Sequence, residues 1–141
     1  MRRLSGLLPL ALLLVWGCTP SPSLKRLVCS GPGRQEVVFD ARSGRLYAFI
    51  EPLNAYRPTP ELRFSVQTTS SLRGDELRIE TRVGEFSREG DASSWQAVDP
   101  PVGSDETFNL KSLTSQLRMV SDRPVRPVDK EGRCELAPLQ T

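Results

Sequence analysis

The feature that most constrains the fold is an alternation of apolar and polar residues with a period of two. Residues 76–83 read ELRIETRV and residues 61–67 read ELRFSVQ, so apolar side chains recur at every second position. Because successive side chains of a strand point to opposite faces, this alternation predicts two strands with one buried and one wet face each, as in antiparallel sheets. The residues expected to face inward are Leu62, Phe64, Val66, Leu77, Ile79, Thr81 and Val83.

Shorter apolar segments between turn residues predict further strands. These are Leu24–Ser30, Gln35–Asp40, Arg45–Ile50, Thr107–Leu110, Thr114–Val120 and Arg133–Leu136. Gly44 supplies the positive φ that a tight hairpin needs between the second and third of them. Proline cannot donate to a strand ladder. We therefore expect loops at 51–60, at Asp99–Ser104 and around Pro124 and Pro127. No helical period persists for three turns.

The first seventeen residues have the pattern of a targeting segment. Arg2 and Arg3 precede Leu7–Trp16, a ten-residue apolar run. Ten residues suit the apolar region of a secretory signal, whereas a membrane span needs about 20. A buried N-terminal helix is the alternative, and Pro9 and the paired arginines argue against it. Residues 1–17 are therefore predicted to be a signal peptide.

Removal of that segment changes the electrostatics. The chain has 19 Lys and Arg against 17 Asp and Glu, and residues 1–17 hold two arginines and no acid. Residues 18–141 are therefore formally neutral. Nucleic-acid binding draws most of its affinity from clustered Lys and Arg, and no basic stripe remains. Nucleic acid is not an expected partner.

The three cysteines fall into two groups, a single cysteine at the predicted signal and a pair in the rest of the chain. Cys18 directly follows the predicted signal, while Cys29 and Cys134 lie near the two ends of the remaining chain. In an oxidising compartment an even pair favours a disulfide, and this one would close a loop of about a hundred residues. Two unrelated buried thiols are the alternative. A bridge would require the first and last strands to lie side by side.

Most catalytic constellations cannot be assembled from this sequence. It contains no histidine, which removes the Ser-His-Asp and Cys-His arrangements and the commonest metal ligand. Its acidic residues lack the spacing of a calcium loop, and its lysines lack S-x-x-K. A pair of carboxylates could serve a glycosidase, but the carboxylates of the clearest strand face water. We expect no enzyme, no metal site and no cofactor.

A few aromatic residues are the candidate surface contacts. Trp95 lies in SSWQAV, and Tyr56 lies in the proline-rich stretch. For Trp95, a position in the core or at a sheet edge is favoured over a ligand-stacking surface. Tyr47 and Phe49 share one strand face and could form a second buried layer. Arg73–Asp75 spells RGD, which resembles the integrin-binding signal, but Gly-Asp before a strand is ordinary turn chemistry.

Residues Val15–Cys18 (VWGC) resemble the lipobox of bacterial lipoproteins. In that family the resemblance implies diacylglycerylation of Cys18 and cleavage before it by signal peptidase II. Thr19 is not aspartate, so an inner-membrane retention signal is absent. The resemblance implies the outer membrane, on its periplasmic face, in a two-membrane bacterium. Two or three acyl chains anchor a protein firmly.

These features give one expected organisation. It comprises a signal peptide (1–17), a lipidated Cys18 with a Pro/Ser tether (18–23), and one β domain (24–141). The domain is expected to be all-β: a small antiparallel sandwich or open barrel of about seven to eight short strands, stapled by a disulfide. Its architecture resembles small disulfide-stapled lipoprotein domains such as the membrane-bound lysozyme inhibitors, without their inhibitory loop motif.

The leading functional hypothesis is a non-catalytic interaction module in the cell envelope. A neutral surface of mixed charges suits contact with an envelope protein or a glycan better than electrostatic capture. The alternative is a barrel with a pocket that carries a small apolar ligand or lipid, or that inhibits an envelope hydrolase. An apolar cavity within the strands would favour the carrier, whereas a solid core with an exposed aromatic patch would favour the interaction module.

Overall fold

The computed structural model describes residues 21–90, 92–121, 123 and 131–141. These residues form antiparallel strands and one 3-10 turn at Glu51–Leu53. The strands are β1 (Leu24–Ser30), β2 (Glu36–Asp40), β3 (Leu46–Ile50), β4 (Ala55–Pro58), β5 (Leu62–Arg63), β6 (Val66–Arg73), β7 (Glu76–Glu89), β8 (Ala92–Ala97), β9 (Gly103–Asn109), β10 (Thr114–Val120) and β11 (Gly132–Ala137).

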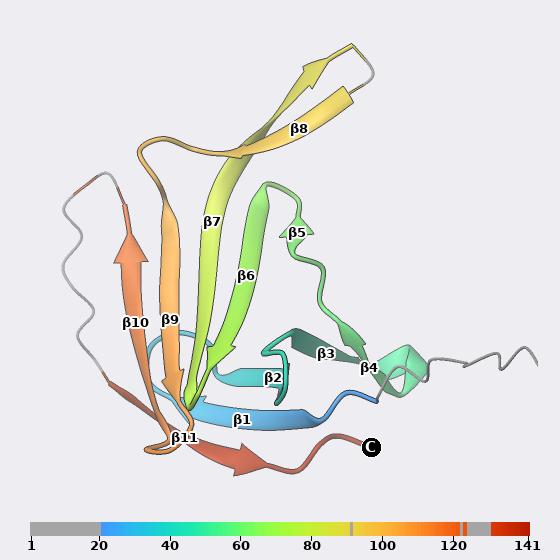
Figure 1. Ribbon diagram of the computed structural model, residues 1–141, viewed down its shortest axis with the longest axis vertical. Coiled ribbons are helices and arrows are strands. Elements are labelled where there is room, and N and C mark those ends of the chain that lie inside the picture. The colour runs from blue at the N-terminus through green and yellow to red at the C-terminus, as the bar shows by residue number, and fades with distance from the viewer. Residues whose placement is uncertain (1–20, 91, 122, 124–130) are drawn as a thin grey trace, which may run out of the picture.

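A single open sheet contains these strands in the order β4-β3-β2-β1-β11-β10-β9-β7-β6-β5, and β8 pairs with β7 outside that path. Figure 1 shows the sheet bent into two halves, with β1, β2, β3 and β11 lying across the foot of β6, β7, β9 and β10. The bend falls where β10 meets β11 through only two residue pairs, Thr114↔Arg133 and Ser115↔Gly132. The two halves thus enclose the core as a sandwich would, although one sheet supplies both.

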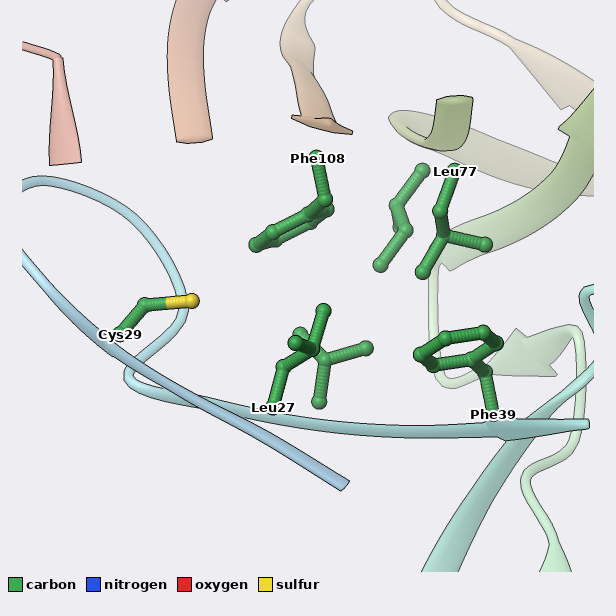
Figure 2. Close-up of a cluster of buried hydrophobic side chains, with 7 residues drawn as sticks. Leu27, Cys29, Phe39, Leu77 and Phe108 are labelled. Carbon is green, nitrogen blue, oxygen red and sulfur yellow. The ribbon is translucent and has the colours of Figure 1, made fainter. Parts of the chain in front are cut away.

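The hydrophobic core lies between the two halves. Figure 2 shows Leu27 and Phe39, from β1 and β2, facing Leu77 and Phe108, from β7 and β9. Ile79 packs in the same cluster, and all five are at most 1% exposed. Burial of side chains this large contributes about 1.5–3 kcal/mol each. The period-two alternation of residues 76–79 is therefore confirmed as a buried and a wet face.

The predicted disulfide is confirmed. Cys29 and Cys134 are directly opposed in the pairing of β1 with β11 and are bonded to each other. The first and last strands lie side by side, as the bridge requires. Cys29 is buried within the core cluster, and Cys134 packs against its margin. The bridge therefore joins the first and last strands of the domain on the side of the core that β1 and β11 form.

The predicted strand at Glu61–Gln67 is wrong. The chain pairs only two residues there as β5, turns at Phe64 with a φ of 56°, and starts β6 at Val66. Phe64 was expected to point inward, but it is 81% exposed. The strand pairing decides this: Arg63 pairs with Val66, which leaves Phe64 and Ser65 as the turn between β5 and β6.

The expected strand number of about seven to eight is too low. Residues 51–60 were expected to be a loop, but Ala55–Pro58 pairs with β3 as β4, with its proline at the end of a short edge strand, where proline is tolerated. β8 and β5 account for the other extra strands. The hairpin expected at Gly44 is present, however, between β2 and β3 (φ 74°). The turn expected at Arg73–Asp75, with Gly74 at φ 58°, joins β6 to β7.

Candidate functional site

The clearest candidate site is a two-stranded ribbon that extends beyond the sheet. The first part of β7 pairs with β6 and β9, and its last six residues pair with β8, from Gly84↔Ala97 to Glu89↔Ala92. Figure 1 shows this ribbon, in yellow, projecting from the body at the end opposite β1. We call residues 84–89 of β7 together with β8 the arm. A two-stranded ribbon alone is marginally stable in water, so its attachment to the body matters.

The arm is fixed at its base by Gly84, Trp95 and Ser65. The Ser65 carbonyl accepts hydrogen bonds from the Gly84 amide (2.7 Å) and from the Trp95 indole Nε1 (3.2 Å). A Cβ placed on Gly84 would overlap the Trp95 ring. The indole therefore lies across the backbone of β7 because residue 84 has no side chain, a known way in which an aromatic ring covers a strand glycine.

The two faces of the arm differ in chemistry. Phe86 lies opposite Trp95 in the strand pairing and is 53% exposed, and the same face carries Arg88. The other face is polar: Ser87 and Ser94 share a hydroxyl hydrogen bond of 2.9 Å. We call the side with Phe86 and Trp95 the aromatic face. Trp95 is half-buried over Gly84, so Phe86 is the exposed ring of this face. An exposed aromatic side chain beside a second ring, with polar residues around it, is typical of surfaces that bind another molecule.

A third aromatic ring lies close to the base of the arm. Phe64 directly precedes Ser65, whose carbonyl holds Gly84 and Trp95. The Arg63 guanidinium lies over the Phe64 ring at 5.6 Å from its centroid. Single exposed apolar side chains are ordinary on protein surfaces. Here Phe64, Phe86 and Trp95 are gathered at one end of the molecule, which makes that end the strongest candidate contact surface.

A cavity of about 200 Å³ opens between the two halves of the sheet. Its apolar lining includes Val37, Leu46 and Ile79, which also belong to or border the core. Polar residues complete the lining: Arg34, Glu36, Tyr47, Thr59, Arg63 and Thr68. Pockets that hold drug-sized ligands measure about 300–1,000 Å³. This cavity suits a much smaller molecule, or water.

The buried carboxylate at Glu106 has a clear structural partner. Its side chain is 8% exposed, and it accepts hydrogen bonds from the Arg34 backbone amide (2.9 Å) and from Arg34 Nε (3.1 Å). Arg34 belongs to the loop between β1 and β2, whereas Glu106 belongs to β9. The ion pair therefore ties that loop to the other half of the sheet.

The structure does not bring the two predicted contact residues together. Trp95 lies on the arm, whereas Tyr56 lies on β4, which is at the opposite end of the molecule, near β1 (Figure 1). The Tyr56 ring packs edge-on against Phe49 with centroids 5.1 Å apart, and its hydroxyl accepts a hydrogen bond from the Gln140 amide (2.8 Å). Tyr56 thus positions the C-terminal segment. Cys18 lies outside the described residues.

Sequence reasoning missed the arm. The predicted strand ended at Val83, where the alternation breaks: the next position on the apolar side is Glu85, and Phe86 falls on the polar side. The sequence nevertheless carries a sign of this hairpin. Phe86 and Trp95, which are paired across the two strands, lie on either side of Gly90, and Gly90 has a positive φ of 62°. Gly-Asp at 90–91 is turn chemistry of the hairpin type. What the sequence could not show is that β8 would lie outside the body.

No match was found when the chain was compared with protein-family models, curated proteins and solved structures. In the part of the chain that the structure describes, no group of three or more acidic or cysteine side chains is placed to hold a metal ion. The described helical residues include no segment long and apolar enough to cross a membrane. The candidate site therefore rests on its own geometry.

Proposed function

We propose that this chain is an exported, lipid-anchored protein of the bacterial cell envelope that acts as a non-catalytic interaction module through its arm. The observation that carries the proposal is the arm itself: an exposed aromatic face on a ribbon that stands clear of the sheet. The proposed partner is a protein of the envelope, since flat aromatic surfaces with polar rims suit protein contacts.

The placement of the arm is compatible with an anchor at Cys18. β1 begins at Leu24, six positions after Cys18. The intervening Pro/Ser stretch spans about 18 Å if extended, at ~3 Å per residue. Because β1 and the arm lie at opposite ends of the molecule (Figure 1), an anchored chain can direct the arm away from the lipid surface. We place it on the periplasmic face of the outer membrane where two membranes are present.

The alternative of a small-ligand carrier is less well supported. The apolar side chains between the two halves are packed as a core, with Leu77 and Ile79 fully buried. The cavity beside them, about 200 Å³, is below the usual ~300 Å³ lower limit for a ligand pocket. The solid core and the exposed aromatic face both favour the interaction module.

The contact surface is tested by site-specific crosslinking in intact cells. A photoreactive amino acid replaces Phe86 in the full-length protein, and a matched probe replaces Leu136, which is exposed to a similar extent (56% against 53%) but lies on β11. We expect a discrete crosslinked product from position 86 and none from position 136. Absence of any product at position 86, or equal products at both positions, would contradict the proposal.

The anchor is tested separately by Cys18→Ser. If Cys18 carries the lipid, the variant loses incorporation of radiolabelled palmitate and leaves the membrane fraction, because the apolar acyl chains supply the attachment. The disulfide-bonded Cys29 and Cys134 provide the internal control, since their replacement leaves labelling in place. Labelling that persists in Cys18→Ser would reject lipidation at this residue.

A further inference from the structure

The outer edge of β8 differs from β4 and β5, the two strands that end the path of the sheet. Proteins protect edge strands with charge, proline or very short length, because open N–H and C=O groups recruit other strands. β4 carries Arg57 and Pro58, and β5 has only two residues, one of them Arg63. β8 reads ASSWQA over six residues. It contains no charge and no proline, so it lacks each of these protective features.

The direction of the open backbone groups on β8 follows from the hydrogen bonds at its base. The Val98 amide donates to the Val83 carbonyl (3.0 Å), whereas the Gly84 amide points the opposite way, to Ser65. Since backbone groups alternate along an antiparallel ladder, Ser94 and Gln96 bond toward β7. Ser93, Trp95 and Ala97 therefore direct their N–H and C=O groups outward. Within the described residues, β7 is the only strand that pairs with β8.

A second copy of this chain satisfies those groups without an electrostatic penalty. β8 brings no charged side chain to either side of the seam. Residues 18–141 are formally neutral, so two copies do not repel each other through net charge. In a two-fold antiparallel pairing, residues whose backbone groups point outward must lie opposite each other. This condition is met when the two-fold axis passes through Trp95 or through Ser94. Both registers are consistent with the ladder.

The aromatic face also becomes continuous in such a pair. A two-fold axis perpendicular to the ribbon keeps the same face of both copies on one side. Phe86 and Trp95 of one copy then lie beside Trp95 and Phe86 of the other. The isolated two-stranded arm becomes a four-stranded sheet, which is more stable than a single ribbon.

We propose that β8 pairs antiparallel with β8 of a second copy, so that the protein forms a two-fold dimer through its arms. This inference rests on the proposed function, because it uses the same arm, and it names a second copy of the chain as the partner at the β8 edge. A six-residue seam is small beside the ~1,600 Å² of a standard interface, so the dimer forms at high protein concentration. Attachment of both copies to one membrane would raise their effective concentration.

The experiment compares Ser93→Lys with Ser87→Lys in the full-length protein. Both add one positive charge to the arm, but Ser93 lies on the open edge and Ser87 lies on the inner strand. Sedimentation equilibrium in density-matched detergent measures the dimer dissociation constant. We expect a concentration-dependent dimer for wild type and Ser87→Lys, and at least about a tenfold weaker dimer for Ser93→Lys, equivalent to ~1.4 kcal/mol. Trp95 fluorescence, recorded in a Trp16→Phe background, checks that the arm remains folded.

Two results would overturn the dimer: a wild-type protein that stays monomeric at every concentration, or a dimer whose dissociation constant is unchanged by Ser93→Lys. A photoreactive residue at position 93 in cells separates this failure from failure of the proposed function. Crosslinks to a different protein alone would reject the second copy and leave the interaction module standing. Absence of any crosslink from positions 86 and 93 would reject both.

Discussion

At the scale of single residues, Asp40 organises the turn that follows β2. Its carboxylate accepts hydrogen bonds from Ser43 Oγ (2.8 Å), from the Ser23 amide (3.1 Å) and from the Arg42 amide (3.2 Å). The hydrogen bond from Ser43, and then those from the backbone, hold the pKa of Asp40 below its ordinary value of 3.8, although partial desolvation opposes them. One side chain thereby fixes the hairpin and the approach to β1.

This arrangement predicts a pH-dependent effect of Asp40→Asn. A carboxyl group whose pKa is lowered by folding stabilises the protein above its unfolded pKa, and the stabilisation is lost as pH falls through the folded pKa. The variant should therefore be less stable than wild type at neutral pH, and the difference should vanish in acid. Urea unfolding at a series of pH values measures it. Ser43→Ala should show the same pH dependence with a smaller loss of stability. A stability difference between Asp40→Asn and wild type that stays constant across pH would contradict the mechanism.

Glu106 predicts a second effect at the residue scale. Glu106→Ala leaves two donors of Arg34 without their acceptor, and loss of hydrogen bonds to a buried charged group costs about 2 kcal/mol. Glu76→Ala is the matched control, because its pair with Arg78 is exposed on both sides and is worth at most ~1 kcal/mol. Urea unfolding at neutral pH measures both. Equal losses for the two variants would show that burial of the Arg34–Glu106 pair is unimportant.

At the scale of elements, β7 lies in two environments: its first part belongs to the sheet that covers the core, and its last six residues belong to the arm. β7 has fourteen residues, and its first half is buried on one face by the core. Its second half leaves the body at Gly84, and the alternation is interrupted at the next residue, because Glu85 stands where an apolar side chain is expected. The interruption does not end the strand, since Trp95 of β8 occupies the space that a side chain at residue 84 would fill. Cross-strand aromatic packing thus continues an element that sequence pattern alone would end.

Gly84→Ala is therefore expected to displace the indole ring. Its Cβ would overlap Trp95, and overpacking of this kind costs about 1–3 kcal/mol. In a Trp16→Phe background, Trp95 is the only tryptophan, so its emission should shift to longer wavelength as the ring becomes more exposed.

Gly74→Ala is the control for that substitution. A Cβ at Gly74 meets no atom within 4 Å, although its φ of 58° adds backbone strain. It should lower stability without moving the fluorescence. If Gly84→Ala kept the wild-type emission, the ring would not depend on the glycine.

At the scale of the whole molecule, the order of the strands explains the position of the disulfide. β1 and β11 lie at the centre of the sheet, although they come from the two ends of the domain. The bridge between Cys29 and Cys134 therefore closes a loop that spans 105 positions of the chain. A cross-link over so long a segment removes much of the freedom of the unfolded chain.

Replacement of both bridge cysteines by alanine is expected to lower the free energy of unfolding by about 4.7 kcal/mol on the chain-entropy scale. Urea unfolding of the oxidised protein and of the Cys29→Ala, Cys134→Ala variant measures the difference. Cys18→Ser is the control, because it removes a cysteine without opening the loop and should leave stability unchanged. Identical unfolding midpoints for the bridged and unbridged proteins would contradict this account.

Some elements could be predicted because their information is local. The alternation at 76–79 predicts the buried face of β7, and Gly44 and Gly74 mark hairpins because their positive φ is costly for other residues. Phe64 could not be predicted in the same way. Its place in an alternating run is typical of a core residue, yet the pairing of β5 with β6 leaves it in an exposed turn. That turn makes contacts with residues that are distant in sequence, since the Ser65 carbonyl accepts hydrogen bonds from Gly84 and Trp95.

The sequence alone determined that the chain folds into antiparallel strands, that Cys29 and Cys134 are the available bridge, and that its charges balance beyond residue 17. Periodicity and composition carry that information because they act within a few residues. Only the tertiary structure decided that one open sheet bends to enclose the core, and that β7 extends past it to form an arm with β8. Those outcomes depend on long-range strand pairing, which fixes whether an aromatic side chain is buried in the core or exposed at a surface.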